Sequence, residues 1–222
     1  MKGLMQDWPL LVHTFIDHAS LHHSEREIVT RKVEGDIHRT NYLEIHSRAR
    51  KFSKALIKLG VKKSDVIGTL AWNTHRHLET WYGITGVGAI YHTLNPRLFL
   101  EQLEYIINHA DNKYIIADIT FVKILEGIES KLSNVKGFIF LTDSENMPET
   151  NLKNIFCYEE MINLEDDDYE WLKVEETDAC GLCYTSGTTG NPKGVLYSHK
   201  SNVLHTLVAN NADAMGIKST DS

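Results

Sequence analysis

Apolar residues recur every three or four positions between Asn41 and Gly60. The repeating positions are Ile45, Ala49, Phe52, Leu56 and Leu59. This spacing lines one face of a helix. Asn41 and Glu44 have the spacing of a capping box at the helix start, and Gly60 supplies a stop at its end. We therefore predict an amphipathic helix whose apolar stripe belongs to the core.

From Asp65 onward, short apolar runs alternate with amphipathic stretches. The predicted strands cover 66–71, 89–93, 114–117 and 138–141, and the predicted helices start at 74 or cover 100–109 and 119–132. Such alternation implies right-handed crossovers between parallel strands. The predicted fold class is α/β, with a mainly parallel sheet that carries helices on both faces.

The segments on either side are less regular. Positions 10–22 have helical spacing, and 28–40 read as two short strands around the turn Glu34-Gly35-Asp36. The stretch 142–177 is more polar, and we interpret most of it as surface connection. Its acidic run 165–168 lacks the Gly and Asn of a calcium loop, so a solvated loop is favoured over a metal site.

Composition and charge narrow the class of protein. The chain has 222 residues, 42% of them apolar, and 23 basic against 30 acidic residues give a net charge of −7. No basic face is expected, so nucleic acid is not a predicted partner. Asp7 and Pro9 interrupt any apolar signal stretch, and the run 81–94 is too short for a transmembrane segment. A cytoplasmic location is expected.

The cysteines are Cys157, Cys180 and Cys183. An odd count without an export signal makes a disulfide framework improbable. Cys180 and Cys183, with His199 and His205, fit the outer limits of a two-Cys, two-His zinc spacing. We favour small core residues over a zinc site, because the residues between them are better explained as a phosphate-binding loop.

The segment 179–199 is an apolar run, a loop rich in hydroxyl groups and glycine, and a second apolar run. Gly187, Gly190 and Gly194 allow backbone N–H groups to approach an anion closely. Lys193 adds a positive charge, and hydroxyl donors come from Thr185, Ser186, Thr188 and Thr189. The composition predicts a site for polyphosphate.

The loop does not have the Walker A spacing, because only two residues separate Gly187 from Gly190 and Asn191-Pro192 precede Lys193. A flexible surface hairpin is the alternative. The ordered Lys-Gly ending between two apolar runs favours the phosphate loop. Pro192 restricts its own backbone and that of Asn191, so the far end of the loop is expected to be stiff.

The segment from Tyr184 to Gly194 resembles the phosphate-loop signature of the adenylate-forming (AMP-binding) superfamily, which includes acyl-CoA synthetases, firefly luciferase and peptide-synthetase adenylation domains. Residues 40–45 resemble the first core motif of that family, and 83–98 resemble the second. The residues of the second segment are most similar to those of the medium- and long-chain fatty acyl-CoA synthetase branch. The resemblance covers nearly the whole chain.

This resemblance implies an enzyme that joins a carboxylate to the α-phosphate of ATP, releases pyrophosphate and transfers the acyl group to coenzyme A, with Mg²⁺. The expected carboxylate is a medium- or long-chain fatty acid. Thr185 is the implied Mg²⁺ contact, and Lys193 would neutralise the departing pyrophosphate. The implied ATP phosphate-binding residues are Thr185, Ser186, Gly187, Thr188, Thr189, Gly190 and Lys193.

Members of the family are normally more than twice this length. We therefore expect the N-terminal part of the large domain, with a first subdomain at about 1–175, the start of the next at about 176–222, and no C-terminal domain. No catalytic residue is assigned within the chain, and this part alone is expected to be inactive. The alternative is a non-catalytic phosphate-binding or interaction module. The oligomeric state stays open between monomer and homodimer.

Overall fold

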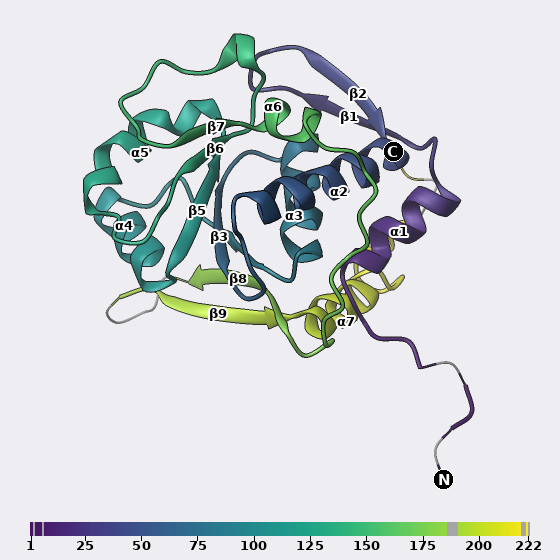
Figure 1. Cartoon of the computed structure of the whole chain (residues 1–222). Coiled ribbons are helices and arrows are strands. Elements are labelled where there is room, and N and C mark those ends of the chain that lie inside the picture. The colour runs from purple at the N-terminus through teal and green to yellow at the C-terminus, as the bar shows by residue number, and fades with distance from the viewer. Residues whose placement is uncertain (2, 6, 186–190, 219–220, 222) are drawn as a thin grey trace.

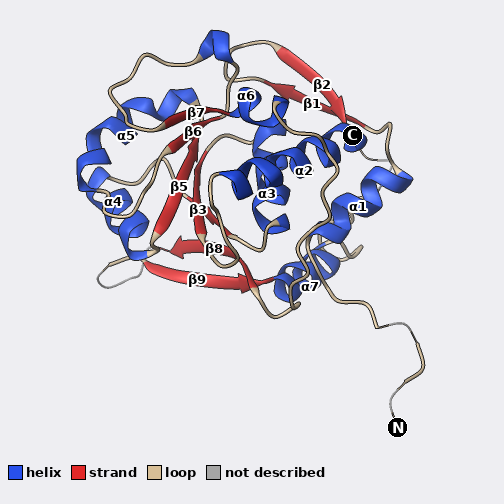
Figure 2. Ribbon diagram, viewed as in Figure 1, coloured by secondary structure: helices blue, strands red, loops and turns tan. Residues whose placement is uncertain are grey.

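A mainly parallel sheet forms the centre of the molecule (Figures 1 and 2). The computed structural model describes residues 1, 3–5, 7–185, 191–218 and 221. Within them, seven strands pair in the order β7-β6-β5-β3-β4-β8-β9, and the β8–β9 pair is antiparallel. A separate antiparallel ribbon is formed by β1 and β2.

The strands are β1 (Glu27–Arg31), β2 (Ile37–Asn41), β3 (Val66–Leu70), β4 (Ile90–Thr93), β5 (Asn112–Ala117), β6 (Phe138–Phe140), β7 (Ile155–Cys157), β8 (Ala179–Thr185) and β9 (Lys193–Ser198). The helices are α1 (His13–His22), α2 (Tyr42–Lys58), α3 (His75–Gly86), α4 (Leu100–His109), α5 (Val122–Ile128), α6 (Tyr158–Asn163) and α7 (His199–Ala209). The predicted α/β class and the predicted strand and helix order from 65 to 141 are confirmed, with the helix predicted at 119–132 divided into α5 and short 3₁₀ turns.

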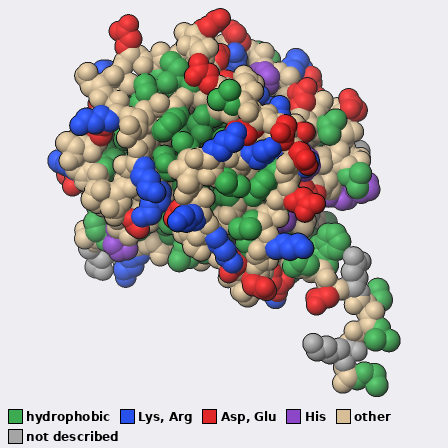
Figure 3. Space-filling model, viewed as in Figure 1, with side chains coloured by type: hydrophobic (Ala, Val, Ile, Leu, Met, Phe, Trp, Pro, Cys, Tyr) green, Lys and Arg blue, Asp and Glu red, His purple; other side chains and the backbone are tan. Residues whose placement is uncertain are grey.

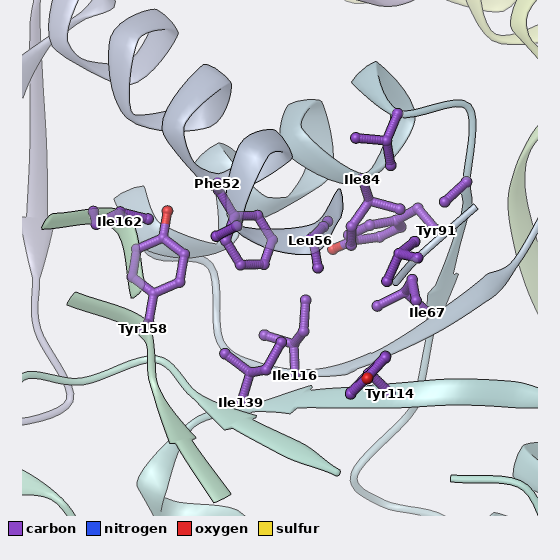
Figure 4. Close-up of a cluster of buried hydrophobic side chains, with 14 of the residues drawn as sticks. Phe52, Leu56, Ile67, Ile84, Tyr91, Tyr114, Ile116, Ile139, Tyr158 and Ile162 are labelled. Carbon is purple, nitrogen blue, oxygen red and sulfur yellow. The ribbon is translucent and has the colours of Figure 1, made fainter. Parts of the chain in front are cut away.

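Strand β5 shows why helices are needed on both faces of the sheet. Tyr114 and Ile116 pack into the core beneath α2, α3 and α6, part of which is drawn in Figure 4. Ile115 and Ala117 pack into a second core beneath α4 and α5. Alternate side chains of a strand point to opposite faces, so a strand that is buried on both sides is apolar throughout.

Helix α2 matches its sequence prediction except at one contact. The Asn41 side chain accepts a hydrogen bond from the Glu44 N–H at 2.9 Å, and Gly60 ends the helix with a φ of +82°. The Glu44 carboxylate accepts from the Thr40 hydroxyl at 2.6 Å. The capping box is therefore half formed, because the Glu44 side chain accepts from the Thr40 hydroxyl and not from the backbone N–H of Asn41.

The interpretation of 142–177 as mostly surface connection is wrong for its middle part. Residues 155–163 form β7 and α6, and Tyr158 is fully buried against Phe52. The cause is length, because a three-residue strand followed by a six-residue helix carries too few positions to show a period. Farther along, Trp171 lies directly against Gly86 of α3, where a side chain would have no room.

A buried carboxylate links α2, α3 and α6. Glu79 on α3 is fully buried, and its two oxygens accept hydrogen bonds from Arg48 Nε at 2.8 Å and from the Tyr158 hydroxyl at 2.7 Å. Burial raises the pKa of Glu79, and the Arg48 guanidinium opposes that rise. Burial alone would lower the pKa of Arg48, but the charge of Glu79 raises it above its ordinary value.

The network extends to the β1–β2 ribbon through a second carboxylate. Glu159 on α6 accepts hydrogen bonds from both Arg48 and Arg76, at 2.8 Å each. Arg76 also donates to Glu34, in the turn of the ribbon, at 2.7 Å and to the Leu141 carbonyl at 3.0 Å. Five separate segments of the chain are thus held by one set of buried ionic contacts.

The surface is mixed in charge but apolar along one edge. Basic and acidic side chains both occur on the face that Figure 3 shows. Strand β9 is last in the sheet order, and α7 exposes Leu204, Leu207 and Val208, which are three and four positions apart on one helical face. In the described part of the chain, no helix has both the length and the apolar character of a membrane span.

We expect Glu79→Ala to lower the free energy of unfolding by about 3–5 kcal/mol, because it leaves the buried Tyr158 hydroxyl without its acceptor and removes one of the two carboxylates that Arg48 contacts. The control is Glu27→Ala, which removes an exposed ion pair with Arg39 and should leave stability unchanged within error. Denaturant titration of both variants measures the difference. Equal stability of the two variants would show that the buried carboxylate is not a structural centre.

The exposed apolar face of α7, beside an edge strand, should make the 222-residue chain self-associate, since large apolar patches are uncommon on soluble monomers. Light scattering should report species larger than a monomer at micromolar concentration. The double variant Leu207→Lys, Val208→Lys should shift the population towards monomer, and Thr206→Lys on the same helix should not. A monodisperse wild-type monomer would contradict this prediction.

Candidate functional site

The hairpin of β8 and β9 carries both ends of the predicted phosphate loop. Thr185 ends β8 and Lys193 begins β9, and the two residues are direct cross-strand partners. Cross-strand partners place their side chains on the same face, about 5 Å apart at Cβ. Both residues are exposed. The other predicted phosphate-binding residues, Ser186, Gly187, Thr188, Thr189 and Gly190, lie outside the described residues.

Tyr184 lies on the opposite face of β8 from Thr185, because neighbouring side chains of a strand alternate. Its hydroxyl is hydrogen-bonded to His109 Nδ1, in the last turn of α4, at 2.6 Å. Its cross-strand partner is Gly194, and a Cβ at that position would lie 3.1 Å from the Tyr184 ring. The tyrosine therefore packs flat across β9 towards α4, and Figure 1 shows the loop end of the hairpin beside α4.

A buried histidine lies behind Tyr184. The ring of His92, on β4, is 5.2 Å from the Tyr184 ring and fully buried, and His92 Nδ1 is 3.0 Å from the Asn112 amide nitrogen. Burial lowers the pKa of His92 to about 4, although the Asn112 hydrogen bond opposes that shift. The ring is therefore neutral at physiological pH and packs as part of the core.

The other face of the hairpin borders a cleft of about 540 Å³. Cys183, two residues before Thr185 on the same face, contacts the Thr93 hydroxyl at 3.1 Å. The cleft is lined by Trp81, Tyr91, Thr93, Cys183, Tyr197 and His205, among others. Its wall combines aromatic surface with a few polar groups, as is typical of small-molecule sites.

The start of α7 fixes the far end of the hairpin. Ser198 caps the helix by accepting from the Ser201 N–H at 3.1 Å. His199 is buried, accepts from the Val12 N–H at 3.3 Å, and has its pKa lowered to about 4, mainly by burial. Cys180 is buried beside Val12 and Val203. In the described part of the chain, no three metal-ligating side chains are grouped as a metal site.

Hydrogen bonds bridge two strand ends at the crevice where open α/β sheets usually bind ligands. Neighbouring strands β3 and β5 lead to crossovers in opposite directions, which marks the switch point of the sheet. There the Trp72 N–H donates to Asp118 at 2.6 Å, and the Trp72 indole N–H donates to Thr120 at 3.1 Å. Burial raises the pKa of Asp118 to about 6. The paired ends of the signature loop make the β8–β9 hairpin the candidate site.

Sequence reasoning identified the two ends of the loop but not its support. Thr185 and Lys193 lie together as a phosphate site requires, and whether they bind ATP stays a prediction. The sequence marks Tyr184 only as the first residue of the signature, and it does not identify His109 or His92 as supports of the loop. Nothing in the spacing of these three residues marks them as neighbours, because two crossovers separate them.

A profile of the AMP-binding enzyme family matches residues 16–221, and the chain belongs to that family. It is 45% identical over its full length to 3-methylmercaptopropionyl-CoA ligase from Ruegeria lacuscaerulensis, and 41% identical to medium-chain-fatty-acid–CoA ligase from Ectopseudomonas oleovorans. The crystal structure of a long-chain-fatty-acid-CoA ligase from Archaeoglobus fulgidus covers all of the chain with a TM-score of 0.81 and 21% identity.

The chain spans about 41% of the length of the two curated relatives and 43% of that crystal structure. The predicted family and the predicted fold are thus confirmed. The predicted subdomain boundary near residue 175 stays a prediction. In this structure β8 and β9 extend the same sheet, since β8 pairs in parallel with β4.

The low pKa of His92 predicts acid sensitivity. The unfolded chain has the ordinary histidine pKa of about 6.5, so between pH 6.5 and 4 it binds more protons than the folded chain. Protonation of His92 in the unfolded chain should therefore lower the free energy of unfolding by about 1 kcal/mol at pH 5.5 and by about 3 kcal/mol at pH 4.

Denaturant titrations of wild type and His92→Gln at pH 7.5, 5.5 and 4.5 check this value, with the exposed His18→Gln as control. The stability difference between wild type and His92→Gln should shift in favour of the variant as the pH falls. A constant difference across this range would show that His92 does not titrate in the stated window.

Proposed function

We propose that the chain is the N-terminal portion of an ATP-dependent acyl-CoA ligase that activates a carboxylate as its acyl-adenylate and transfers it to coenzyme A. The observation that carries the proposal is the pairing of Thr185 with Lys193 at the two ends of the signature loop, in a chain of the AMP-binding family. The relatives named above supply the acyl-CoA ligase chemistry.

The hairpin can offset the repulsion between anions in the first step, which is adenylation of the carboxylate. A carboxylate anion must approach the α-phosphate of a highly charged nucleotide, and pyrophosphate must leave. The Lys193 ammonium, beside the loop, would meet the charge of the β- and γ-phosphates and then of pyrophosphate. An exposed cation on a hairpin stem that other contacts hold can do this with little reorganisation.

Mg²⁺ is assigned to the Thr185 side of the stem. A hydroxyl oxygen suits a hard cation that keeps several waters and bridges phosphates, and the Thr185 side chain shares a face with Lys193. When bound, the ion would shield phosphate charge during attack on the α-phosphate. The seven residues of the predicted phosphate site are proposed to hold the β- and γ-phosphates.

The cleft beside the hairpin supports the carboxylate substrate class. It lies on the face that carries Thr185 and Lys193, so an acid bound there would be next to the nucleotide phosphates. Its aromatic wall suits an aliphatic chain. We propose a medium- or long-chain fatty acid, and the 3-methylmercaptopropionyl-CoA ligase relative makes shorter linear acids the next substrates to test.

The second candidate, a phosphate-binding or interaction module without catalysis, is not favoured, because the named relatives that align with the whole chain are ligases. The two functions differ in one measurement. A complete ligase containing this chain should catalyse fatty-acid-dependent exchange of pyrophosphate into ATP. The 222-residue chain alone should give none, since it aligns with less than half of each ligase.

In the complete ligase, Lys193→Ala should slow adenylation by about 10²–10³, a loss typical for one electrostatic group, and slow thioester formation much less. The reason is that the charge Lys193 meets belongs to pyrophosphate, which has left before the thiol attacks. Single-turnover kinetics of the two half-reactions measures the ratio. Lys200→Ala, whose ammonium pairs with Glu176, is the matched control. Equal slowing of both half-reactions would show that Lys193 does not act on the charge of pyrophosphate.

A further inference from the structure

The hydrogen bond between Tyr184 and His109 joins the loop-bearing hairpin to a distant part of the sheet. At 2.6 Å it connects residues 75 positions apart, one at the end of β8 and the other in the last turn of α4. His109 is itself held by stacking on Tyr105, with ring centroids 5.2 Å apart. The anchor for the tyrosine is thus an exposed histidine whose ring orientation is supported by this stacking.

The helix end that carries His109 is fastened to the next crossover. Asn108 donates to the Lys131 carbonyl at 2.9 Å and accepts from the Ser133 N–H at 3.0 Å. Glu104 pairs with Lys131 at 3.1 Å. Movement of the end of α4 would disturb these contacts, so the Tyr184 hydroxyl is bonded to a residue of a braced helix end.

Gly194 gives the tyrosine its path across the hairpin. A Cβ at position 194 would lie 3.1 Å and 3.3 Å from two atoms of the Tyr184 ring and 3.2 Å from the Leu182 side chain. Contacts this short would push the ring away from β9. A glycine here, directly after Lys193, allows the ring to lie against the backbone of the opposite strand and still reach α4.

We propose that Tyr184 is a positioning residue, which fixes the stem of the phosphate-binding hairpin against α4 through His109. Tyr184 adjoins Thr185, and its ring covers Gly194, which adjoins Lys193. One side chain thus restrains both ends of the loop from the face opposite the cleft. Restraint of this kind lowers the ordering cost when an anion binds, which favours affinity. The effect on catalysis rests on the proposed function. The restraint of the hairpin by Tyr184 does not.

The restraint is tested first without any ligand, by amide hydrogen exchange in the 222-residue chain. Tyr184→Phe keeps the ring and removes the hydrogen bond, and we expect exchange at the amides of 184, 185 and 193–195 to accelerate about fivefold, the factor for one neutral hydrogen bond. Amides of β3 and β5 should be unchanged. Tyr169→Phe, which removes a hydroxyl bonded to the Gly86 carbonyl at 3.1 Å, is the matched control and should not affect the hairpin.

Substitutions at His109 separate the hydrogen bond from simple packing. His109→Asn keeps an acceptor near the position of Nδ1 and should retain slow exchange at the hairpin. His109→Leu should behave like Tyr184→Phe, and the double variant should add little further acceleration. Unchanged hairpin exchange in both Tyr184→Phe and His109→Leu overturns the proposal.

The consequence for function is tested in the complete ligase. Tyr184→Phe should raise the KM for ATP about three- to tenfold with kcat changed less than twofold, and His109→Asn should stay near wild type in both. Faster hairpin exchange with an unaltered KM overturns the positioning role. If the complete protein has no ligase activity, the proposed function fails, and the exchange measurement still decides whether Tyr184 holds the stem.

Discussion

The fold depends on a buried charge that it must neutralise. Glu79 lies where no water reaches, so its carboxylate is tolerable only while Arg48 and Tyr158 donate to it. Those donors come from α2 and α6, and Glu159 extends the network through Arg76 to the β1–β2 ribbon. Apolar packing alone would allow these helices to slide on the sheet. The ion pairs fix them in one arrangement, because a shift would separate the paired charges.

Fixing those helices also fixes the cleft side of the hairpin. Trp81 lies five positions after Arg76 on α3 and lines the cleft, so the network and the cleft share a helix. On the other side of β4, the core beneath α4 supports Tyr184 through His92. The hairpin therefore lies between two apolar cores, and the core beneath α2, α3 and α6 borders the ion-pair network.

The sequence allowed prediction of what depends on near neighbours. The α2 stripe, the strand order from 65 to 141 and the loop signature each follow from spacing within about twenty residues. It did not allow prediction of β7 and α6, which are too short to show a period, or of the Glu79 network, whose members are up to 125 positions apart. Glu79 appears in the sequence as one more charge on a helix, and only its neighbours in space make it structural. Likewise His109 becomes part of the candidate site only because the crossovers bring α4 beside β8.

The two faces of the hairpin explain why its register matters. Thr185 and Lys193 lie on the same face of the hairpin as Cys183, which lines the cleft, whereas Tyr184 lies on the face towards α4, and a slip of one residue along β8 would exchange these faces. The pairing of β8 with β9 is irregular between Ala179 and Gly181, and parallel pairing with β4 holds the other edge of β8. Tyr184 adds a restraint at the loop end of the strand, because its ring packs over Gly194 and its hydroxyl is bonded to His109. Binding of a phosphate needs donors that are held in one arrangement, and Tyr184 contributes to this by holding the backbone next to Thr185 and next to Lys193.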